Sequence, residues 1–178
     1  MVRTTIYQCS NKGHNIQELT TVIFCLTKKG DIVEKKVMAG YCQTCNLYYL
    51  LNTDYERLRK QYVLLCRVID NTIKVNNGTG LFSNFNRESI MMQYGYTVSQ
   101  AEELSDAQRR TILEFLLISK VMTKTEICSH LDWLISTRGY DKSRFKKAIT
   151  KWREDRQFIE NYKLNNSREV IVKRIFKH

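Results

Sequence analysis

The sequence predicts an α+β protein in which a β-rich amino-terminal part precedes a mainly helical carboxy-terminal part. Three observations support this fold class. Runs of β-branched residues dominate residues 1–70, an Asn- and Gly-rich stretch occupies 71–86, and apolar residues then recur every three to four positions, which is typical of helices. We therefore expect a domain at 1–70, a linker at 71–86 and a helical, basic domain at 87–178.

The composition indicates a soluble and basic chain. Hydrophobic residues make up 43% of the 178 residues and charged residues 26%, and 29 Lys and Arg against 18 Asp and Glu give a net charge of +11. No window approaches 18 consecutive apolar residues, and the amino terminus lacks an apolar segment followed by a small-residue cleavage site. We therefore expect no membrane association and a cytoplasmic location, where cysteines remain thiols.

The β-rich part is predicted to begin with a hairpin. Two β-branched runs, 20–26 and 32–38, are joined by a loop that contains a glycine. Three further elements are expected in chain order: a strand at 47–51, a short helix at 55–61 and a buried strand at 62–69. Asn52, Thr53 and Asp54 are candidate caps for the short helix.

The helical part is predicted to begin with two capped helices. The residues from Ser105 to Gln108 form a capping box. In such a box the Ser105 side chain accepts a hydrogen bond from the Gln108 backbone amide, and the Gln108 side chain accepts one from the Ser105 backbone amide. The helix that this box opens is expected to end near residue 120. The residues from Thr123 to Glu126 form a second box, and its helix is expected to end near Gly139.

A third helix is expected from about Ser143 to Tyr162, with one apolar face turned inward. The residues of that face are Phe145, Ala148, Ile149, Trp152, Ile159 and Tyr162. The β-branched stretch 169–176 then predicts a terminal strand or hairpin. Three helices followed by a hairpin is the order of a winged-helix module, which serves here as an analogy.

Four residues have the spacing of a metal site. Cys9 and His14 form one short pair, and Cys42 and Cys45 form a CxxC pair on the far side of the expected hairpin. Two such turns present four ligands to a tetrahedral ion, and Zn²⁺ is the ion expected first. Four protein ligands leave no position for an activated water, so the expected zinc is structural. The alternative is that these cysteines are packed thiols and His14 is a surface residue.

The other three cysteines stand alone in apolar surroundings. Cys25 and Cys66 lie within expected strands, where the simplest role is that of a small buried side chain. The sequence leaves open whether either of them replaces one of the four proposed ligands. Cys128 lies in the second capped helix and is expected to belong to the core.

The paired turns, Cys9 to His14 and the YCQTC segment at 41–45, resemble the zinc-ribbon class over residues 1–50. Proteins of that class bind nucleic acid or dock on other proteins, so the resemblance implies either role. Residues 94–162, from YGYTVSQAEELSDAQRR through KWREDRQFIENY, are similar to the carboxy-terminal part of uncharacterised bacterial proteins that accompany mobile elements and anti-phage systems. That similarity implies a setting in antiviral defence and assigns no site.

Positive charge gathers at the carboxy-terminal end of the chain. Residues 138–178 contain 13 basic and 5 acidic residues and therefore hold +8 of the net charge of +11. Phosphate backbones attract such a surface because binding releases counterions. The candidate nucleic-acid-binding residues are Lys142, Arg144, Lys146, Lys147, Lys151, Arg153, Lys173 and Arg174.

Aromatic residues near the linker have the composition of a base-stacking platform, but interdomain packing has this composition more often. They are Phe82, Phe85, Tyr94 and Tyr96.

The leading hypothesis is a non-enzymatic zinc protein that binds DNA or RNA through the basic helical face. The alternative is an interaction module that docks on a nucleoprotein machine, as a CRISPR or other phage-defence component, accessory factor or inhibitor. An acidic protein surface as the ligand, or a merely solvated face, also fits the charge. No phosphate-binding loop, HExxH or GxSxG motif is present, so no catalytic residue is assigned. The partner and the oligomeric state stay open.

Overall fold

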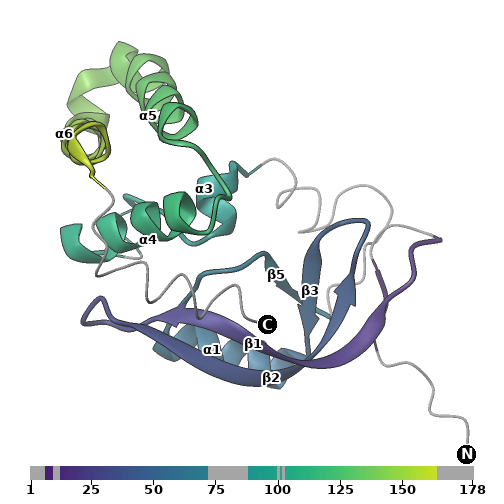
Figure 1. The fold of residues 1–178 in the computed structure, drawn as a ribbon. Helices are drawn as coiled ribbons and strands as arrows, with labels where there is room; N and C mark the ends of the chain where they lie inside the picture. The colour runs from purple at the N-terminus through teal and green to yellow at the C-terminus, as the bar shows by residue number, and fades with distance from the viewer. Residues whose placement is uncertain (1–6, 10–12, 72–87, 100, 102, 164–178) are drawn as a thin grey trace, which may run out of the picture. The chain divides into compact units, whose positions relative to one another are not determined.

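The structure is a computed structural model that describes residues 7–9, 13–71, 88–99, 101 and 103–163. These residues form a five-stranded sheet and five α-helices, so the mixed α and β composition is confirmed (Figure 1). The chain divides into two compact units, Met1–Gly95 and Tyr96–His178. The division falls after residue 95, whereas the sequence analysis placed the linker at 71–86, and residues 72–87 lie outside the described part.

The first unit is built on a long hairpin. β1 (Gln17–Leu26) and β2 (Ile32–Cys42) pair antiparallel along their whole length, with Gln17 opposite Tyr41. Their turn contains Gly30 at φ 92°, a left-handed conformation that favours glycine. Both strands are longer than the β-branched runs 20–26 and 32–38. Pairing with the other strand, rather than residue type, extends them toward the cysteine and histidine residues.

A short strand and a helix follow the hairpin. β3 (Leu47–Leu50) pairs antiparallel with β2, and α1 (Asn52–Gln61) begins directly after it. The N-cap of α1 is Leu51, without a side-chain bond, so the predicted caps are wrong. Asn52 instead donates to a carboxylate oxygen of Asp70 at 2.5 Å, and Asp54 pairs with Arg57.

The prediction of a single strand at 62–69 is wrong. This run forms β4 (Val63–Leu64), which pairs antiparallel with β1, and β5 (Val68–Asp70), which pairs parallel with β3. The sheet order is β4-β1-β2-β3-β5, so these two strands lie at opposite edges. An uninterrupted apolar run predicts burial but does not reveal a change of partner strand.

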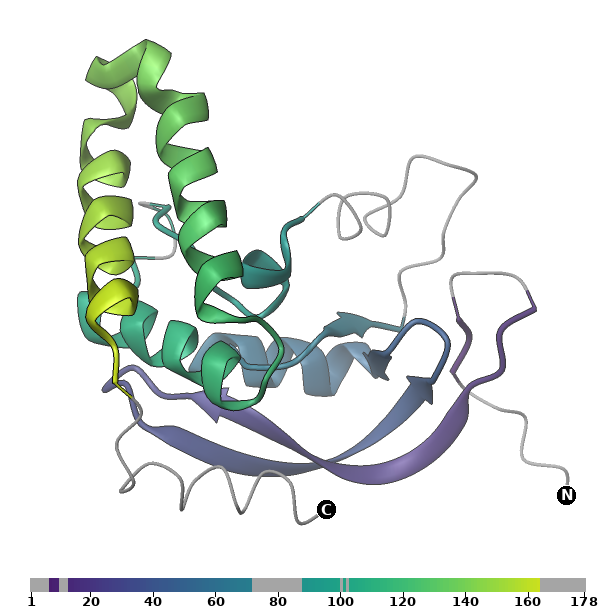
Figure 2. The same ribbon diagram turned by 45° about the horizontal axis from the view of Figure 1, so that its top comes forward.

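The connection 65–67 requires the sheet to curl. The edges of a flat five-stranded sheet are about 19 Å apart, whereas the Cα atoms of Leu64 and Val68 are separated by at most about 14 Å of chain. The hairpin is strongly curved in Figure 2, in agreement with this limit. The Leu65 amide donates to the Phe24 carbonyl of β1, and the Arg67 carbonyl accepts from the Tyr48 amide of β3, both at 2.9 Å.

The core of the first unit combines the hairpin, the edge strands and α1. One cluster of its buried residues contains Ile23, Cys25, Val37, Ala39, Leu50, Leu58, Leu64 and Val68. A short helix, α3 (Ile90–Gln93), completes the described part of this unit, and its N-cap Ser89 accepts a hydrogen bond from the Met92 amide. The sequence analysis did not predict this helix, which is too short to show a period.

The second unit contains the three predicted helices, α4 (Asp106–Ile118), α5 (Lys124–Arg138) and α6 (Lys142–Asn161). Both capping boxes are confirmed, with the two reciprocal hydrogen bonds present in each. Gly139 follows α5 as predicted, but in a right-handed conformation that leads into the 3₁₀ turn η1 (Gly139–Asp141).

The winged-helix analogy is not confirmed. Figure 2 shows α5 and α6 running side by side in opposite directions, joined by η1, whereas a helix-turn-helix crosses its two helices steeply. The predicted strand at 169–176 lies outside the described residues. The apolar face of α6 is confirmed at its centre, because Ile149, Trp152 and Ile159 are buried. Phe145, Ala148 and Tyr162 are only partly buried.

Among the residues that the structure describes, no helix has both the length and the apolar character needed to cross a lipid bilayer.

The capping box of α4 gives a small and specific stability prediction. Ser105→Ala removes the acceptor of the Gln108 amide and is expected to cost about 1 kcal/mol in the free energy of unfolding. Both tryptophans of the chain, Trp133 and Trp152, lie in the second unit, so urea denaturation followed by tryptophan fluorescence reports on this unit. Ser129→Ala, on the exposed side of α5, is the control, expected within about 0.5 kcal/mol. Equal effects of the two variants would contradict the role of the cap.

Candidate metal centre

The structure brings the four predicted ligands together. One ligand atom from each of Cys9, His14, Cys42 and Cys45 lies within 4.8 Å of the other three. The antiparallel register explains this arrangement, because Gln17 opposite Tyr41 places the chain that enters β1 beside the end of β2. Cys42 ends β2, and the turn toward β3 carries Cys45. These four residues can therefore hold a metal ion.

Five of the six separations between ligand atoms are close to those of a tetrahedral site, and the sixth, between the Sγ atoms of Cys42 and Cys45, is at most 4.8 Å. Cys9 Sγ lies 3.6 Å from Cys42 Sγ and 3.7 Å from Cys45 Sγ. His14 Nδ1 lies 3.2 Å from Cys45 Sγ and 3.8 Å from the Sγ atoms of Cys9 and Cys42. A tetrahedron with zinc–sulfur bonds of about 2.3 Å and zinc–nitrogen bonds of about 2.0 Å requires about 3.8 Å between sulfurs and about 3.5 Å between sulfur and nitrogen. The geometry therefore leaves room for one ion at the centre.

Two side chains outside the ligand set support it. The buried Tyr49 hydroxyl donates to Cys9 Sγ at 3.3 Å, a contact that stabilises a thiolate and orients it. Arg67 donates from Nη1 to the Cys45 carbonyl at 2.9 Å and from Nε to the side-chain oxygen of Gln93 at 2.7 Å. The guanidinium group of Arg67 thus joins the second ligand turn to the connection that precedes β5 and to α3.

Backbone conformation at both turns suits the residues present. Gly13 has φ 83° and Asn46 has φ 48°, and left-handed conformations are accessible to these residue types. In β2, a Cβ atom at Gly40 would lie 2.6 Å from Tyr7 Cβ and 2.8 Å from Ile16 Cγ2. Glycine at this position therefore allows the segments on either side of the first ligand pair to pack directly on β2.

Cys25 and Cys66 do not belong to the ligand group. Burial raises the pKa of Cys25 to about 11. Burial, with a smaller contribution from Cys25, raises the pKa of Cys66 to about 12. Both therefore remain protonated thiols at neutral pH, as expected for packed side chains. Within the described part of the chain, only Cys9, His14, Cys42 and Cys45 form a cluster that can hold an ion.

The structure describes some of the predicted nucleic-acid-binding residues. Arg144, Lys146, Lys147 and Arg153 are exposed on α6, and Lys151 is partly buried on the same helix. Lys142 is the first residue of α6, while Lys173 and Arg174 lie outside the described residues. In the described part of the chain, the ion pairs of arginine involve Arg57, Arg109 and Arg156 and none of the candidate residues.

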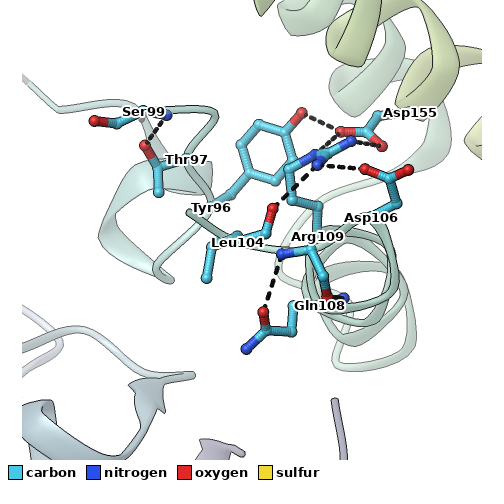
Figure 3. Close-up of polar contacts among 9 residues, drawn as sticks. Tyr96, Thr97, Ser99, Leu104, Asp106, Gln108, Arg109 and Asp155 are labelled. Carbon is cyan, nitrogen blue, oxygen red and sulfur yellow. Dashed lines mark hydrogen bonds and ion pairs between the residues drawn. The ribbon is translucent and has the colours of Figure 1, made fainter. Parts of the chain in front are cut away.

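Sequence analysis missed a buried ionic cluster in the second unit (Figure 3). The side chains of Arg109 and Asp155 are both 0% exposed, and Arg109 Nε donates to Asp155 Oδ2 at 2.7 Å. Arg109 also donates to Asp106 and to the Leu104 carbonyl, and the Tyr96 hydroxyl donates to Asp155 Oδ2 at 2.7 Å. One signal was available: Asp155 lies three residues after Trp152, on the apolar face of α6.

Burial and the neighbouring carboxylate change the pKa values of Arg109 and Tyr96 in this cluster. Burial lowers the pKa of Arg109, but hydrogen bonds to Asp155 and the charge of that carboxylate outweigh it, so the net pKa is raised. Burial and the negative charge of Asp155 raise the pKa of Tyr96. Tyr96 is therefore a buried hydroxyl donor, which agrees with packing, the interpretation favoured from the sequence, and not with the alternative of base stacking. Tyr94 is partly buried, while Phe82 and Phe85 lie outside the described residues.

The comparisons with known proteins do not assign the chain to a family. No protein-family model matches the chain, and no curated protein or solved structure matches it. The resemblance to zinc ribbons therefore rests on the cluster of three cysteines and one histidine, and the finer ribbon fold is not confirmed. The similarity of residues 94–162 to proteins of mobile elements and anti-phage systems gains no support from these comparisons.

Proposed function

We propose that this protein is a non-enzymatic, cytoplasmic nucleic-acid-binding protein. A structural zinc ion holds its first unit together, and α6 of its second unit contacts the phosphate backbone of DNA or RNA. The proposal rests on four exposed basic side chains of α6 that take no part in the ion pairs of the described residues. They are Arg144, Lys146, Lys147 and Arg153.

The donor set supports zinc as the ion. Three thiolates and one imidazole are soft and borderline ligands, which suit Zn²⁺ better than Mg²⁺ or Ca²⁺. Four protein ligands fill a tetrahedral shell, so the ion has no open position for substrate. Its role is then to join the start of β1 to the turn after β2, which stabilises the first unit.

The helical positions support phosphate contact. Lys146 and Arg153 are both exposed and seven residues apart, which places them on the same side of α6. Arg144 lies in the first turn of α6, which has no acidic residue of its own after the N-cap Asp141, so this cation lies at the positive end of the helix dipole, where it destabilises the helix slightly. A bound polyanion would offset that cost. A face that serves only solubility does not require this arrangement.

Charge reversal tests the proposal. Wild-type protein is expected to bind duplex DNA with a log–log salt slope of about −3 to −4, if four phosphates are contacted at about −0.9 each. Replacing Lys146, Lys147, Lys151 and Arg153 by glutamate should abolish this dependence and weaken binding at low salt. A matched variant with the same change in net charge reverses the exposed residues Lys28, Lys29, Lys36 and Lys60 of the first unit and should retain most of the affinity.

Electrophoretic mobility measurements with single- and double-stranded DNA and RNA separate the two functional hypotheses. Docking on a nucleoprotein machine predicts little affinity for free nucleic acid and tight association with a protein partner that carries an acidic groove. Absence of binding to all four probes at low salt would refute the proposal and favour docking.

A further inference from the structure

Two aromatic side chains of the second unit are unusually exposed. Trp133 on α5 is 57% exposed and Tyr140 in η1 is 78% exposed. Large aromatic side chains of this kind are normally buried or used in recognition. Trp133 is also oriented by a neighbour, because the His130 ring stacks on it with centroids 5.6 Å apart and planes inclined by 25°. An oriented and exposed ring is suited to accept another flat ring.

The two rings are separated by a spacing that suits a chain-like ligand. Tyr140 is seven positions after Trp133 in the sequence, which corresponds to about two helical turns and a rise of about 10 Å along the helix axis. At this spacing they share one side of α5 and its continuation, with Thr137 between them. A ligand that follows the helix axis can contact both rings.

Two arginines near Tyr140 in the sequence supply positive charge. The guanidinium groups of Arg138 and Arg144 lie over the Phe145 ring, 5.2 and 5.3 Å from its centroid. Both cations are thus held beside the same ring, and neither takes part in an ion pair of the described residues. The nearby Asp141 carboxylate accepts from the Arg144 amide as the cap of α6. Two cations held beside one ring attract an anion more strongly than either cation alone.

We infer that the α5–α6 turn, through Trp133, Arg138, Tyr140 and Arg144, is a contact site for single-stranded nucleic acid. The rings stack on unpaired bases, and the guanidinium groups bind the neighbouring phosphates. A duplex buries its base faces within the helix, so it offers these rings nothing to stack on. This inference rests on the proposed function and specifies its ligand. An acidic protein would satisfy the arginines, but it does not require two oriented aromatic rings.

Fluorescence anisotropy of the full-length protein tests the site with labelled oligonucleotides of equal length: single-stranded DNA, single-stranded RNA and duplex DNA. Trp133→Ala and Tyr140→Ala are each expected to weaken single-strand binding about 5- to 150-fold, since stacking contributes about 1 to 3 kcal/mol per base. Duplex binding should change less than about twofold, because a duplex leaves no base face for these rings. Tyr140→Phe keeps the ring and should bind like wild type. Met92→Ala, an exposed apolar residue of the first unit, is the control.

The arginines have a separate readout. Replacing Arg138 and Arg144 by alanine should reduce the magnitude of the single-strand salt slope by about 1.4, from about 0.7 for each of two phosphates. Retained fluorescence of the buried Trp152 shows that each variant is folded. A preference of the DNA over the RNA probe, or the reverse, identifies which strand the site takes, and either preference supports the inference.

Three results would overturn the inference. In the first, the aromatic variants bind single strands as wild type does. In the second, they lose single-strand and duplex binding equally. In the third, they keep both and lose binding to a protein partner. In each case the proposed function survives if the lysine reversal on α6 still abolishes the salt dependence. If wild-type protein binds none of the probes, the inference and the proposed function fail together.

Discussion

Cys42→Ser is expected to abolish metal binding and to unfold the first unit. The Cys42 side chain is fully buried, among Leu47, Tyr49 and Ile69, and its sulfur is one of four atoms placed for an ion. Structural zinc supplies folding free energy directly, and its apparent binding free energy in zinc-finger peptides is about 10 to 16 kcal/mol at neutral pH. Elemental analysis should find one zinc per wild-type chain and none in the variant. Far-UV circular dichroism should show loss of strand signal.

The second unit gives an internal reference for this experiment. Both tryptophans lie there, so the urea transition followed by tryptophan fluorescence should hardly change in Cys42→Ser. Cys128→Ser, a cysteine of α5 outside the cluster, should retain one zinc per chain. Freshly purified, reduced wild-type protein without metal would refute the assignment. Zinc retained after combined Cys9→Ser and His14→Ala replacement would instead move the ligand set toward Cys25 or Cys66.

Asp155→Asn is expected to destabilise the second unit by about 3 to 5 kcal/mol. The variant keeps the size of the side chain but leaves the fully buried Arg109 without its anionic partner. The exposed Asp106 remains on the other side of Arg109 at 2.8 Å and compensates only in part. Urea denaturation followed by tryptophan fluorescence measures the change.

Two further variants separate lost charge balance from lost packing. Tyr96→Phe removes one neutral donor to Asp155 and should cost only about 1 kcal/mol. The combined replacement Arg109→Met and Asp155→Leu removes both charges and should destabilise less than Asp155→Asn alone, since apolar residues often replace a buried pair without penalty. If the double variant is the less stable one, the bonds of Arg109 to Leu104 and Asp106 matter more than the ion pair.

The helical part was predictable because its signals are local. The Ser105 and Thr123 capping boxes each lie within four residues, and the structure has the expected bonds in both. The metal ligands were predictable for the same reason, since each ligand pair is short and the hairpin that joins the pairs is read from adjacent residues. Local pattern is enough wherever the partners are close in sequence.

The failures concern partners that are distant in sequence. Nothing in residues 62–69 shows that Val63 pairs with β1 and Val68 with β3. Likewise, Arg109 and Asp155 are 46 residues apart, and one inward-facing carboxylate does not reveal which cation neutralises it. The hydrogen bond from the Tyr49 hydroxyl to Cys9 Sγ also joins residues that are distant in sequence. It could not be predicted, because a tyrosine in an apolar strand is usually only a packing residue.

The connection at 65–67 also bears on how the first unit opens. It ties β4 and β5, which are the two edges of the sheet, through a chain segment with almost no slack. An edge strand normally frays by itself, but here detachment of either edge pulls on the other. We therefore expect the amide hydrogens of the two edges to exchange with solvent in one concerted event, so that the curved sheet behaves as a single cooperative unit rather than a set of independently opening strands.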